Sequence, residues 1–224
     1  MRYFPINLDI QGKPVTVVGG GGVATRKCLR LVEAGACVTV ISPRLDPSLR
    51  ELATNGHIRH MARKYASGDL IDAFLVFAAT DDPATNRAVA EDARRMGIPA
   101  DITDAPGLGS FTSSAVINRG ELLLTVSTGG RAPALARRIR EALEIQFGPE
   151  YAAVLDLHGR VREKLLTAKG DSVYNKQILN TLAGHDLPTL FRNHAFEEID
   201  HLLLSLCGQG FTLAELGVSE KDSA

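Results

Sequence analysis

The segment VVGGGGVATRK, residues 17–27, joins two valines to a helix-like stretch through four consecutive glycines. Ordering glycine costs more backbone entropy than ordering any other residue, so this run indicates that the main chain approaches another group closely. Residues 15–18 are β-branched without polar alternation, which predicts a buried strand. Apolar residues then recur at helical spacing until Gly35, and a second buried strand follows at 37–42. The stretch therefore predicts a βαβ unit.

The alternation of strands and helices continues to residue 103. Further helices are expected at 47–55 and 83–96, and further strands at 57–65, 73–80 and 98–103. Strands that alternate with helices are typical of a parallel sheet covered on both faces. The sequence therefore predicts an α/β fold with a Rossmann-type doubly wound parallel sheet.

The pattern changes near residue 110. Two strands joined at residues 118–120 predict a hairpin. A helix is expected over 132–147, and charged helical segments follow it. The apolar stripe of the 132–147 helix consists of Leu135, Ile139, Ala142 and Leu143. We therefore expect a Rossmann domain over residues 1–112, a small α+β dimerisation region over 113–148 and a helical domain over 149–224.

Composition narrows the class of protein. The 224 residues carry a formal net charge of −1, which gives no indication of a nucleic-acid or membrane partner. No apolar stretch approaches the roughly 20 residues of a membrane helix, and the first residues lack a signal-peptide core, so we expect a cytoplasmic protein. The three cysteines lack metal-ligand spacing, so no metal site is expected, and Cys28 and Cys37 are predicted to be buried thiols.

Gly19, Gly21 and Ala24 match the GxGxxG/A dinucleotide fingerprint. The first residue allows a tight turn, the second leaves room for a pyrophosphate, and the third lets the helix pack closely on the strand. A tight turn without a ligand is the alternative. The acidic residue expected about 20 positions later to hold the ribose is absent. Ser42 and Arg44 stand there instead, so both NAD and NADP stay open.

Ligands of open α/β sheets bind beyond the carboxyl ends of the strands. Thr80 and Asp81 end the most apolar strand and are expected to border the nicotinamide ribose, although helix capping would also explain such residues. Asp104 follows a later strand in the turn DAPG. A carboxylate at that position would act as a general base, or would satisfy its own backbone in an Asx-turn.

The segment STGGRAPALARRIR, residues 127–140, is a candidate anion site. Two glycines precede a helix start, and several arginines surround it, which suits a substrate rich in carboxylates or phosphates. The alternative is a solvated helix face with Glu141 and Glu144 as partners. The candidate substrate-binding residues are Ser127, Thr128, Gly129, Arg131, Arg137 and Arg138.

Four segments, taken together and in order, resemble the precorrin-2 dehydrogenase/sirohydrochlorin ferrochelatase family, a module also found as the amino-terminal part of siroheme synthase. They are YFPINLDIQGKPVTVVGGGGVATRK, FAATDDPATN, DITDAPGLGSF and LLLTVSTGGRAPALARRIRE, and the resemblance covers about residues 1–147. It implies NAD-dependent oxidation of precorrin-2 to sirohydrochlorin, often followed by insertion of Fe²⁺ to give siroheme. Iron would then be a substrate and not a cofactor.

The resemblance also implies roles for particular residues. Gly22 and Val23 would contact the pyrophosphate side of NAD, and Pro43 and Arg44 would contact its adenosine side. Asp104 falls on the family's essential aspartate, which is implicated in both the dehydrogenase and the chelatase steps.

Two departures from the family pattern stand near these positions. Thr128 takes the place of a serine that is phosphorylated in some members, and it keeps the hydroxyl. Asp101 takes the place of an asparagine, which leaves the division of labour between Asp101 and Asp104 open.

Two alternative functions stay open at this stage. The protein would be a dehydrogenase only, with iron inserted by a separate chelatase, or a nucleotide-sensing Rossmann module that regulates a partner. The apolar residues of the hairpin at 110–128 predict a homodimer, because hydrophobic strand faces rarely stay exposed to water.

Overall fold

The computed structural model describes residues 2–167 and 172–218. It consists of two compact units, the first formed by the chain up to Ser113 together with Gly129–Arg131, and the second by Ser114–Thr128 and the chain from Ala132 onward. The strands of the first unit are β1 (Pro14–Val18), β2 (Cys37–Ile41), β3 (Ile58–Met61), β4 (Leu75–Ala78) and β5 (Ala100–Ile102), and its helices are α1 (Gly22–Glu33), α2 (Pro47–Thr54) and α3 (Pro83–Met96).

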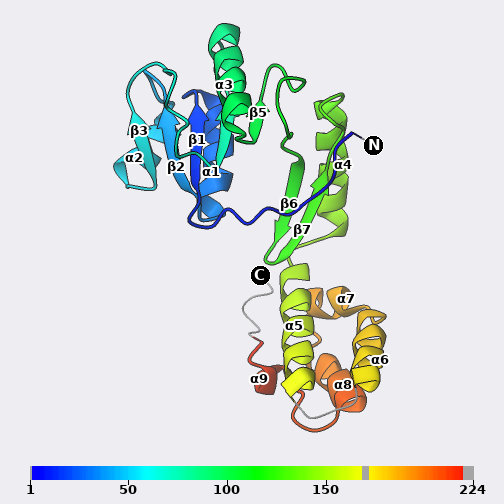
Figure 1. Cartoon of the computed structure of the whole chain (residues 1–224). Coiled ribbons are helices and arrows are strands. Elements are labelled where there is room, and N and C mark those ends of the chain that lie inside the picture. The colour runs from blue at the N-terminus through cyan, green and yellow to red at the C-terminus, as the bar shows by residue number, and fades with distance from the viewer. Residues whose placement is uncertain (1, 168–171, 219–224) are drawn as a thin grey trace. The chain divides into compact units, whose positions relative to one another are not determined.

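The five strands form one parallel sheet in the order β3-β2-β1-β4-β5. Helices α1 and α2 pack on one face and α3 packs on the other (Figure 1). Val15 and Val17 of β1 enter the core beneath α1, whereas Val18 enters the core beneath α3, as the alternation of side chains along a strand requires. The predicted doubly wound parallel sheet is therefore confirmed, with strands shorter than expected.

The strand order reverses between β1 and β4. The chain runs outward from β1 to β3 and then returns to pair β4 against the other side of β1. In open α/β sheets this reversal leaves a crevice at the carboxyl ends of the two strands, where ligands bind. The turn at residues 19–22 follows β1 at this position, and Ala79 and Thr80 follow β4.

Cys28 is buried in α1, as predicted, but the prediction for Cys37 is wrong because that residue is exposed. Cys37 is the first residue of β2, where the strand has not yet entered the core, and its thiol faces the carbonyl oxygen of Gly12 at 3.7 Å.

A buried ion pair links α1 to the edge strand β5. The Nζ atom of Lys27 lies 2.7 Å from Oδ2 of Asp101, and the two side chains are 15% and 7% exposed. The hydroxyl of Ser113 donates to the same carboxylate oxygen at 2.6 Å. Lys27 also lies over the ring of Phe77, 4.8 Å from its centroid. The ion pair therefore lies on the face of β5 opposite the one that α3 covers.

Replacing Lys27 with methionine is expected to lower the free energy of unfolding by about 3 kcal/mol, because the buried Asp101 carboxylate loses its counter-charge. The hydroxyl of Ser113 still donates to that carboxylate, which keeps the loss at the low end for such a change. Urea unfolding followed by circular dichroism measures the loss. Lys64→Met, at an exposed lysine of the same unit, is the control and should unfold like wild type. Equal stability of both variants would contradict the burial of the pair.

The second unit begins with an antiparallel hairpin of β6 (Ala115–Arg119) and β7 (Leu122–Val126), against which α4 (Pro133–Gln146) packs. Ile117 of β6 is buried beneath α4, and Ala136 of α4 is buried as well. The remaining helices are α5 (Tyr151–Thr167), α6 (Ser172–Ala183), α7 (Leu187–Arg192), α8 (Phe196–Cys207) and α9 (Leu213–Leu216). They share one apolar core around Leu157, Phe191 and Leu203. The predicted small α+β region and helical region are thus both present.

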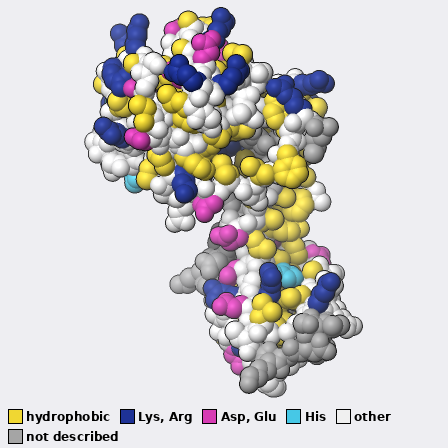
Figure 2. Space-filling view, viewed as in Figure 1, with side chains coloured by type: hydrophobic (Ala, Val, Ile, Leu, Met, Phe, Trp, Pro, Cys, Tyr) yellow, Lys and Arg dark blue, Asp and Glu magenta, His cyan; other side chains and the backbone are white. Residues whose placement is uncertain are grey.

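Of the apolar stripe predicted for α4, Leu143 is half-buried and the other three residues are exposed. Leu135 is 53% exposed and Ile139 is 39% exposed, and Ala142 is exposed as well. The side of α4 that faces the hairpin carries Ala136 and lies about 100° around the helix from this stripe. Figure 2 shows apolar side chains gathered over the β6–β7 hairpin as well. None of the helices in the described parts of the chain is long and apolar enough to span a membrane.

Candidate functional site

The glycine turn after β1 is packed against two neighbouring loops. Gly19 has a φ of +121°, and a Cβ atom there would lie 2.3 Å from the carbonyl oxygen of Ala79. A Cβ atom on Gly20 would lie 2.0 Å from the carbonyl oxygen of Arg44. Real Cβ atoms do not approach backbone oxygens so closely. The protein itself therefore requires glycine at both positions, and sequence reasoning had singled out only Gly19.

The next two glycines face open space. A Cβ atom on Gly21 would meet no atom within 4 Å, and one on Gly22 would meet only Nη1 of Arg26, at 4.0 Å. Gly21 is the N-cap of α1, and no side chain caps the helix there. Uncapped N–H groups at a helix N-terminus, with room in front of them, fit a pyrophosphate. Val23 follows in the first turn of the helix and is half-buried.

The loop after β2 lies against this turn. The backbone N–H of Asp46 donates to the carbonyl oxygen of Gly20 at 2.7 Å. The Ser42 hydroxyl donates to the carbonyl oxygen of Arg44 at 2.7 Å, so its proton is already committed within the loop. Pro43 and Arg44 have exposed side chains at this position. Asp46 supplies a carboxylate in the loop, although five residues after the end of β2 and not at its tip.

On the other side of the crevice, Thr80 and Asp81 lead from β4 to Asp82, the N-cap of α3. The Asp82 carboxylate caps the helix by accepting from the N–H of Ala84 at 3.0 Å and the hydroxyl of Thr85 at 2.6 Å. The Thr85 hydroxyl and the Ala84 N–H hold the pKa of the Asp82 carboxyl below its usual value. Asp82 is therefore the N-cap of α3, whereas Asp81 is exposed and has no hydrogen bond to the described residues.

Asp104 lies beyond the end of β5 and is exposed. Its Oδ1 atom accepts a hydrogen bond of 2.8 Å from the side-chain amide of Asn86, a residue of α3 that is only 1% exposed. The other carboxylate oxygen, Oδ2, has no hydrogen bond to any described residue. One oxygen is thus held and the other is open to solvent, which suits a carboxylate that exchanges a proton with a bound molecule.

The two aspartates of this segment have different environments. Asp101 lies within β5 and points toward α1, where Lys27 and Ser113 occupy its carboxylate. Asp104 lies after the strand and contacts α3 instead. Because the sheet separates α1 from α3, the two carboxylates lie in different surroundings: Asp101 is 5% exposed and paired with Lys27, whereas Asp104 is exposed and has no counter-charge among the described residues.

The candidate anion site divides between the two units. Gly129 and Arg131 belong to the first unit, whereas Ser127, Thr128, Arg137 and Arg138 belong to the second. Within the second unit, the Thr128 hydroxyl accepts from the N–H of Ala132 at 3.3 Å, at the start of α4. Arg137 is paired with Glu141 at 2.8 Å on the surface of α4, as the solvated-face alternative expected. Arg131 and Arg138 are exposed and make no ion pair with the described residues.

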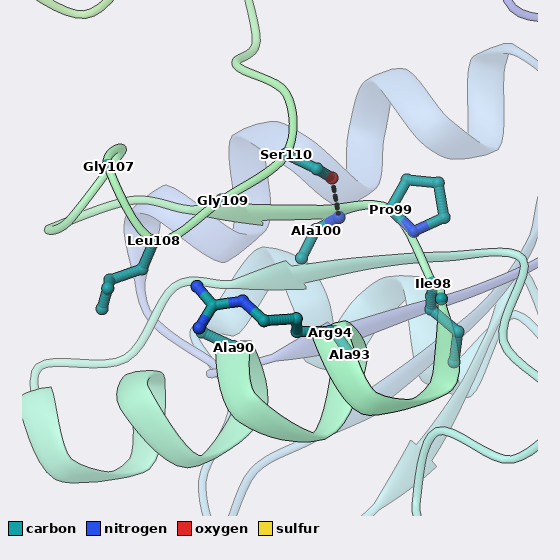
Figure 3. A pocket seen from close by; sticks show the side chains of 11 residues that line it. Ala90, Ala93, Arg94, Ile98, Pro99, Ala100, Gly107, Leu108, Gly109 and Ser110 are labelled. Carbon is teal, nitrogen blue, oxygen red and sulfur yellow. Dashed lines mark hydrogen bonds between the residues drawn. The ribbon is translucent and has the colours of Figure 1, made fainter.

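A shallow pocket of about 350 Å³ lies at the outer edge of the sheet, beside the beginning of β5 (Figure 3). The crevice lies at the opposite ends of the strands. In the pocket, the Ser110 hydroxyl accepts a hydrogen bond from the N–H of Ala100, and Arg94 is the only charged residue of the wall. This pocket therefore lacks the acid–base groups that the crevice provides. No three His, Cys, Asp or Glu side chains converge on a metal site in the parts of the chain that the structure describes.

The fold and the crevice together define a dinucleotide-binding protein of the doubly wound class. An uncapped helix begins after β1, and an exposed carboxylate, that of Asp104, follows β5. Comparison with known proteins agrees. Residues 6–115 match a family model described as "Putative NAD(P)-binding", and residues 119–145 match one described as "Sirohaem biosynthesis protein central".

The chain is 39% identical over 186 residues to siroheme synthase 3 of Aeromonas hydrophila subsp. hydrophila, a match that covers 83% of this chain and 40% of the relative. It is 43% identical over 169 residues to siroheme synthase of Methylococcus capsulatus, covering 74% of this chain and 36% of the relative. The chain thus spans about two fifths of the length of these curated relatives.

Among solved structures, SirC, precorrin-2 dehydrogenase, superposes with a TM-score of 0.72 at 25% sequence identity, over 89% of this chain and 98% of that one. The protein belongs to the siroheme synthase and precorrin-2 dehydrogenase family. The resemblance expected from the sequence is therefore confirmed.

Proposed function

We propose that this protein oxidises precorrin-2 to sirohydrochlorin with NAD⁺ during siroheme biosynthesis. The observation that carries the proposal is the pairing of an uncapped, glycine-lined helix start after β1 with the available Asp104 carboxylate after β5, in a fold shared with a precorrin-2 dehydrogenase. When bound, NAD⁺ accepts a hydride from the substrate.

The residues assigned to the dinucleotide come from the crevice. Gly21, Gly22 and Val23 would hold the pyrophosphate with backbone N–H groups at the start of α1, where the helix dipole favours an anion. The backbone of Gly19 shapes the turn. Thr80 and Asp81 would border the nicotinamide ribose, after β4.

The loop after β2 supports NAD over NADP. Pro43 and Arg44 would face the adenosine. The Ser42 hydroxyl donates its proton to the carbonyl oxygen of Arg44, so it is not a donor for a 2′-phosphate. The Asp46 carboxylate, which caps α2 by accepting from the N–H of Ser48 at 3.1 Å, adds a negative charge to the same loop and would disfavour a 2′-phosphate. A tighter dissociation constant for NADPH than for NADH in a fluorescence titration would overturn this preference.

Asp104 would accept the proton that leaves the tetrapyrrole as its hydride is transferred. Its Oδ1 is held by Asn86, and its Oδ2 is open to a bound molecule. The carboxylates of the substrate would be bound by Ser127, Thr128 and Gly129 with Arg131, Arg137 and Arg138, because guanidinium groups pair well with carboxylates.

Formation of NADH with precorrin-2 and NAD⁺ tests the proposal most directly. We expect the absorbance of NADH to rise in proportion to enzyme concentration, and the spectrum of sirohydrochlorin to appear at the same rate. Binding of NAD⁺ without turnover of precorrin-2 would indicate the nucleotide-sensing alternative instead.

We also propose that the same carboxylate assists insertion of Fe²⁺ into sirohydrochlorin. Metalation releases two pyrrole protons, and the free oxygen of Asp104 would accept them one at a time and pass each to solvent, because the side chain is exposed. Fe²⁺ is then a substrate. Mixing the protein with sirohydrochlorin and Fe²⁺ in the absence of NAD⁺ separates the two activities. A rate of siroheme formation equal to the rate without protein would leave the dehydrogenase as the sole activity.

We propose further that the second unit forms a homodimer through its exposed apolar residues. Leu123 of β7 is 46% exposed, and Leu135, Ile139 and Ala142 form an exposed stripe on α4. The three α4 residues lie along one side of the helix, and an exposed apolar patch of this kind marks an interaction site on a soluble protein. We expect a dimer in sedimentation at micromolar concentration, and a monomer after Ile139→Lys. Leu166→Lys, at a leucine of α5 that is 68% exposed, is the matched control and should stay dimeric. A monomeric wild type would contradict the proposal.

A further inference from the structure

We propose that Asn86 positions Asp104 in the active site. Its buried side-chain amide bonds to both Thr80 and Asp104, and so fixes the Asp104 carboxylate relative to the end of β4. The inference rests on the proposed function, in which Asp104 accepts a proton. Asn86 lies in the first turns of α3 and is 1% exposed, whereas Asp104 is exposed in a loop. Neither the spacing of residues nor the fingerprint motif singles out this asparagine.

The hydrogen bonds of Asn86 use the full capacity of its amide. Its Oδ1 accepts from the Thr80 hydroxyl at 2.7 Å and from the Thr80 N–H at 3.3 Å. Its Nδ2 donates to the Thr80 carbonyl oxygen at 3.1 Å and to Oδ1 of Asp104 at 2.8 Å. An asparagine amide has two acceptor and two donor positions, so none is left for a ligand.

The orientation of the amide follows from its partners. The Asp104 carboxylate and the Thr80 carbonyl only accept hydrogen bonds, and the Thr80 N–H only donates. A reversed amide would set oxygen against oxygen at Asp104 and at the Thr80 carbonyl, and would set N–H against N–H at Thr80. The donor therefore points at Asp104.

The bond from Asn86 to Asp104 fixes the loop after β5 to helix α3. Helix α3 is anchored in the core through Val89, Ala90 and Ala93, and the backbone N–H of Asn86 bonds to the carbonyl oxygen of Asp82. The Asp104 side chain has no other hydrogen bond to the described residues, so without Asn86 its carboxylate would rotate freely in solvent. Holding Oδ1 leaves Oδ2 in one defined place. Misplacing a reacting group by about 1 Å can cost 100-fold in rate.

Steady-state kinetics test the inference. Asn86→Ala should lower kcat for precorrin-2 oxidation by about 10- to 100-fold while the KM for NAD⁺ changes less than about twofold. Asp82→Ala is the matched control, because it removes the cap of the same helix and keeps the Asn86–Asp104 bond, so kcat should stay near wild type. Equal losses of kcat in both variants, or none in Asn86→Ala, would overturn the proposal.

Asn86→Leu provides a second variant if Asn86→Ala does not fold. Leucine has nearly the same shape as asparagine but cannot donate a hydrogen bond to Asp104. We expect the same fall in kcat, with the KM for NAD⁺ again little changed. Wild-type kcat in folded Asn86→Leu would overturn the proposal.

A cycle of unfolding measurements separates this inference from the proposed function, because it needs no substrate. The unfolding equilibrium constants of wild type, Asn86→Ala, Asp104→Ala and the double variant should deviate from additivity by about a factor of ten, as expected for a hydrogen bond to a charged group. Additive effects would show that the bond is not made and would overturn the positioning role. Coupling without any NADH formation by wild type would refute the proposed function and, with it, the catalytic purpose of the bond.

Discussion

Replacing Gly20 with alanine is expected to lower the free energy of unfolding of the first unit by about 3 kcal/mol or more, because overpacking costs this much where the neighbours cannot move. The added methyl group would lie 2.0 Å from the carbonyl oxygen of Arg44 and 2.7 Å from the hydroxyl oxygen of Ser42. The first of these atoms is backbone, in a loop that is tied to Gly20 by the N–H of Asp46. Relief of the clash would therefore break the loop away from the turn. Urea unfolding measures the loss.

Gly21→Ala is the matched variant one residue later. Its methyl group would meet no protein atom within 4 Å, so the free energy of unfolding should fall by at most about 1 kcal/mol, the cost of alanine at an N-cap. The same methyl group would enter the space proposed for the pyrophosphate. We therefore expect the dissociation constant for NADH to rise at least about tenfold, which corresponds to about 1.4 kcal/mol. Wild-type affinity in Gly21→Ala would contradict the assigned cofactor site, and wild-type stability in Gly20→Ala would contradict the packing of the turn.

Asp104→Asn should lower kcat for precorrin-2 oxidation by about 100- to 10,000-fold, the usual contribution of a positioned general base. Asparagine has the same shape as aspartate and keeps an oxygen for the amide of Asn86, so the fold should be retained. It cannot accept a proton at neutral pH. The KM for NAD⁺ and the unfolding midpoint should stay close to wild type, because the side chain is exposed. Turnover at the wild-type rate would refute the role of Asp104.

Asp101→Asn provides the contrasting outcome three residues earlier. This carboxylate is buried against Lys27, so its replacement should lower stability and leave kcat of the folded protein near wild type. The pair of variants decides which of the two aspartates acts on the substrate, a question that their closeness in sequence left open. A loss of kcat in Asp101→Asn at full stability would reverse the assignment.

Much of the fold could be predicted from local patterns. Buried strands of β-branched residues, helices with apolar repeats and the glycine turn at residues 19–22 each depend on neighbours a few positions away. The predicted parallel sheet and the antiparallel hairpin followed from these patterns. The exposure of Leu135 and Ile139 could not be predicted, because an apolar stripe on a helix does not show whether the same chain or a partner covers it.

Local patterns were enough to predict the doubly wound sheet, the glycine turn and the position of Asp104 at the end of a strand, because periodicity and glycine conformation act over short distances. The partners of the two aspartates depend on contacts between distant segments and could not be predicted in this way. Asn86 and Asp104 are 18 residues apart, and Lys27 and Asp101 are 74 residues apart. Which side chains meet over such separations depends on the face of the sheet that each helix covers. That choice made Asp101 a structural counter-charge and left one oxygen of Asp104 available for chemistry.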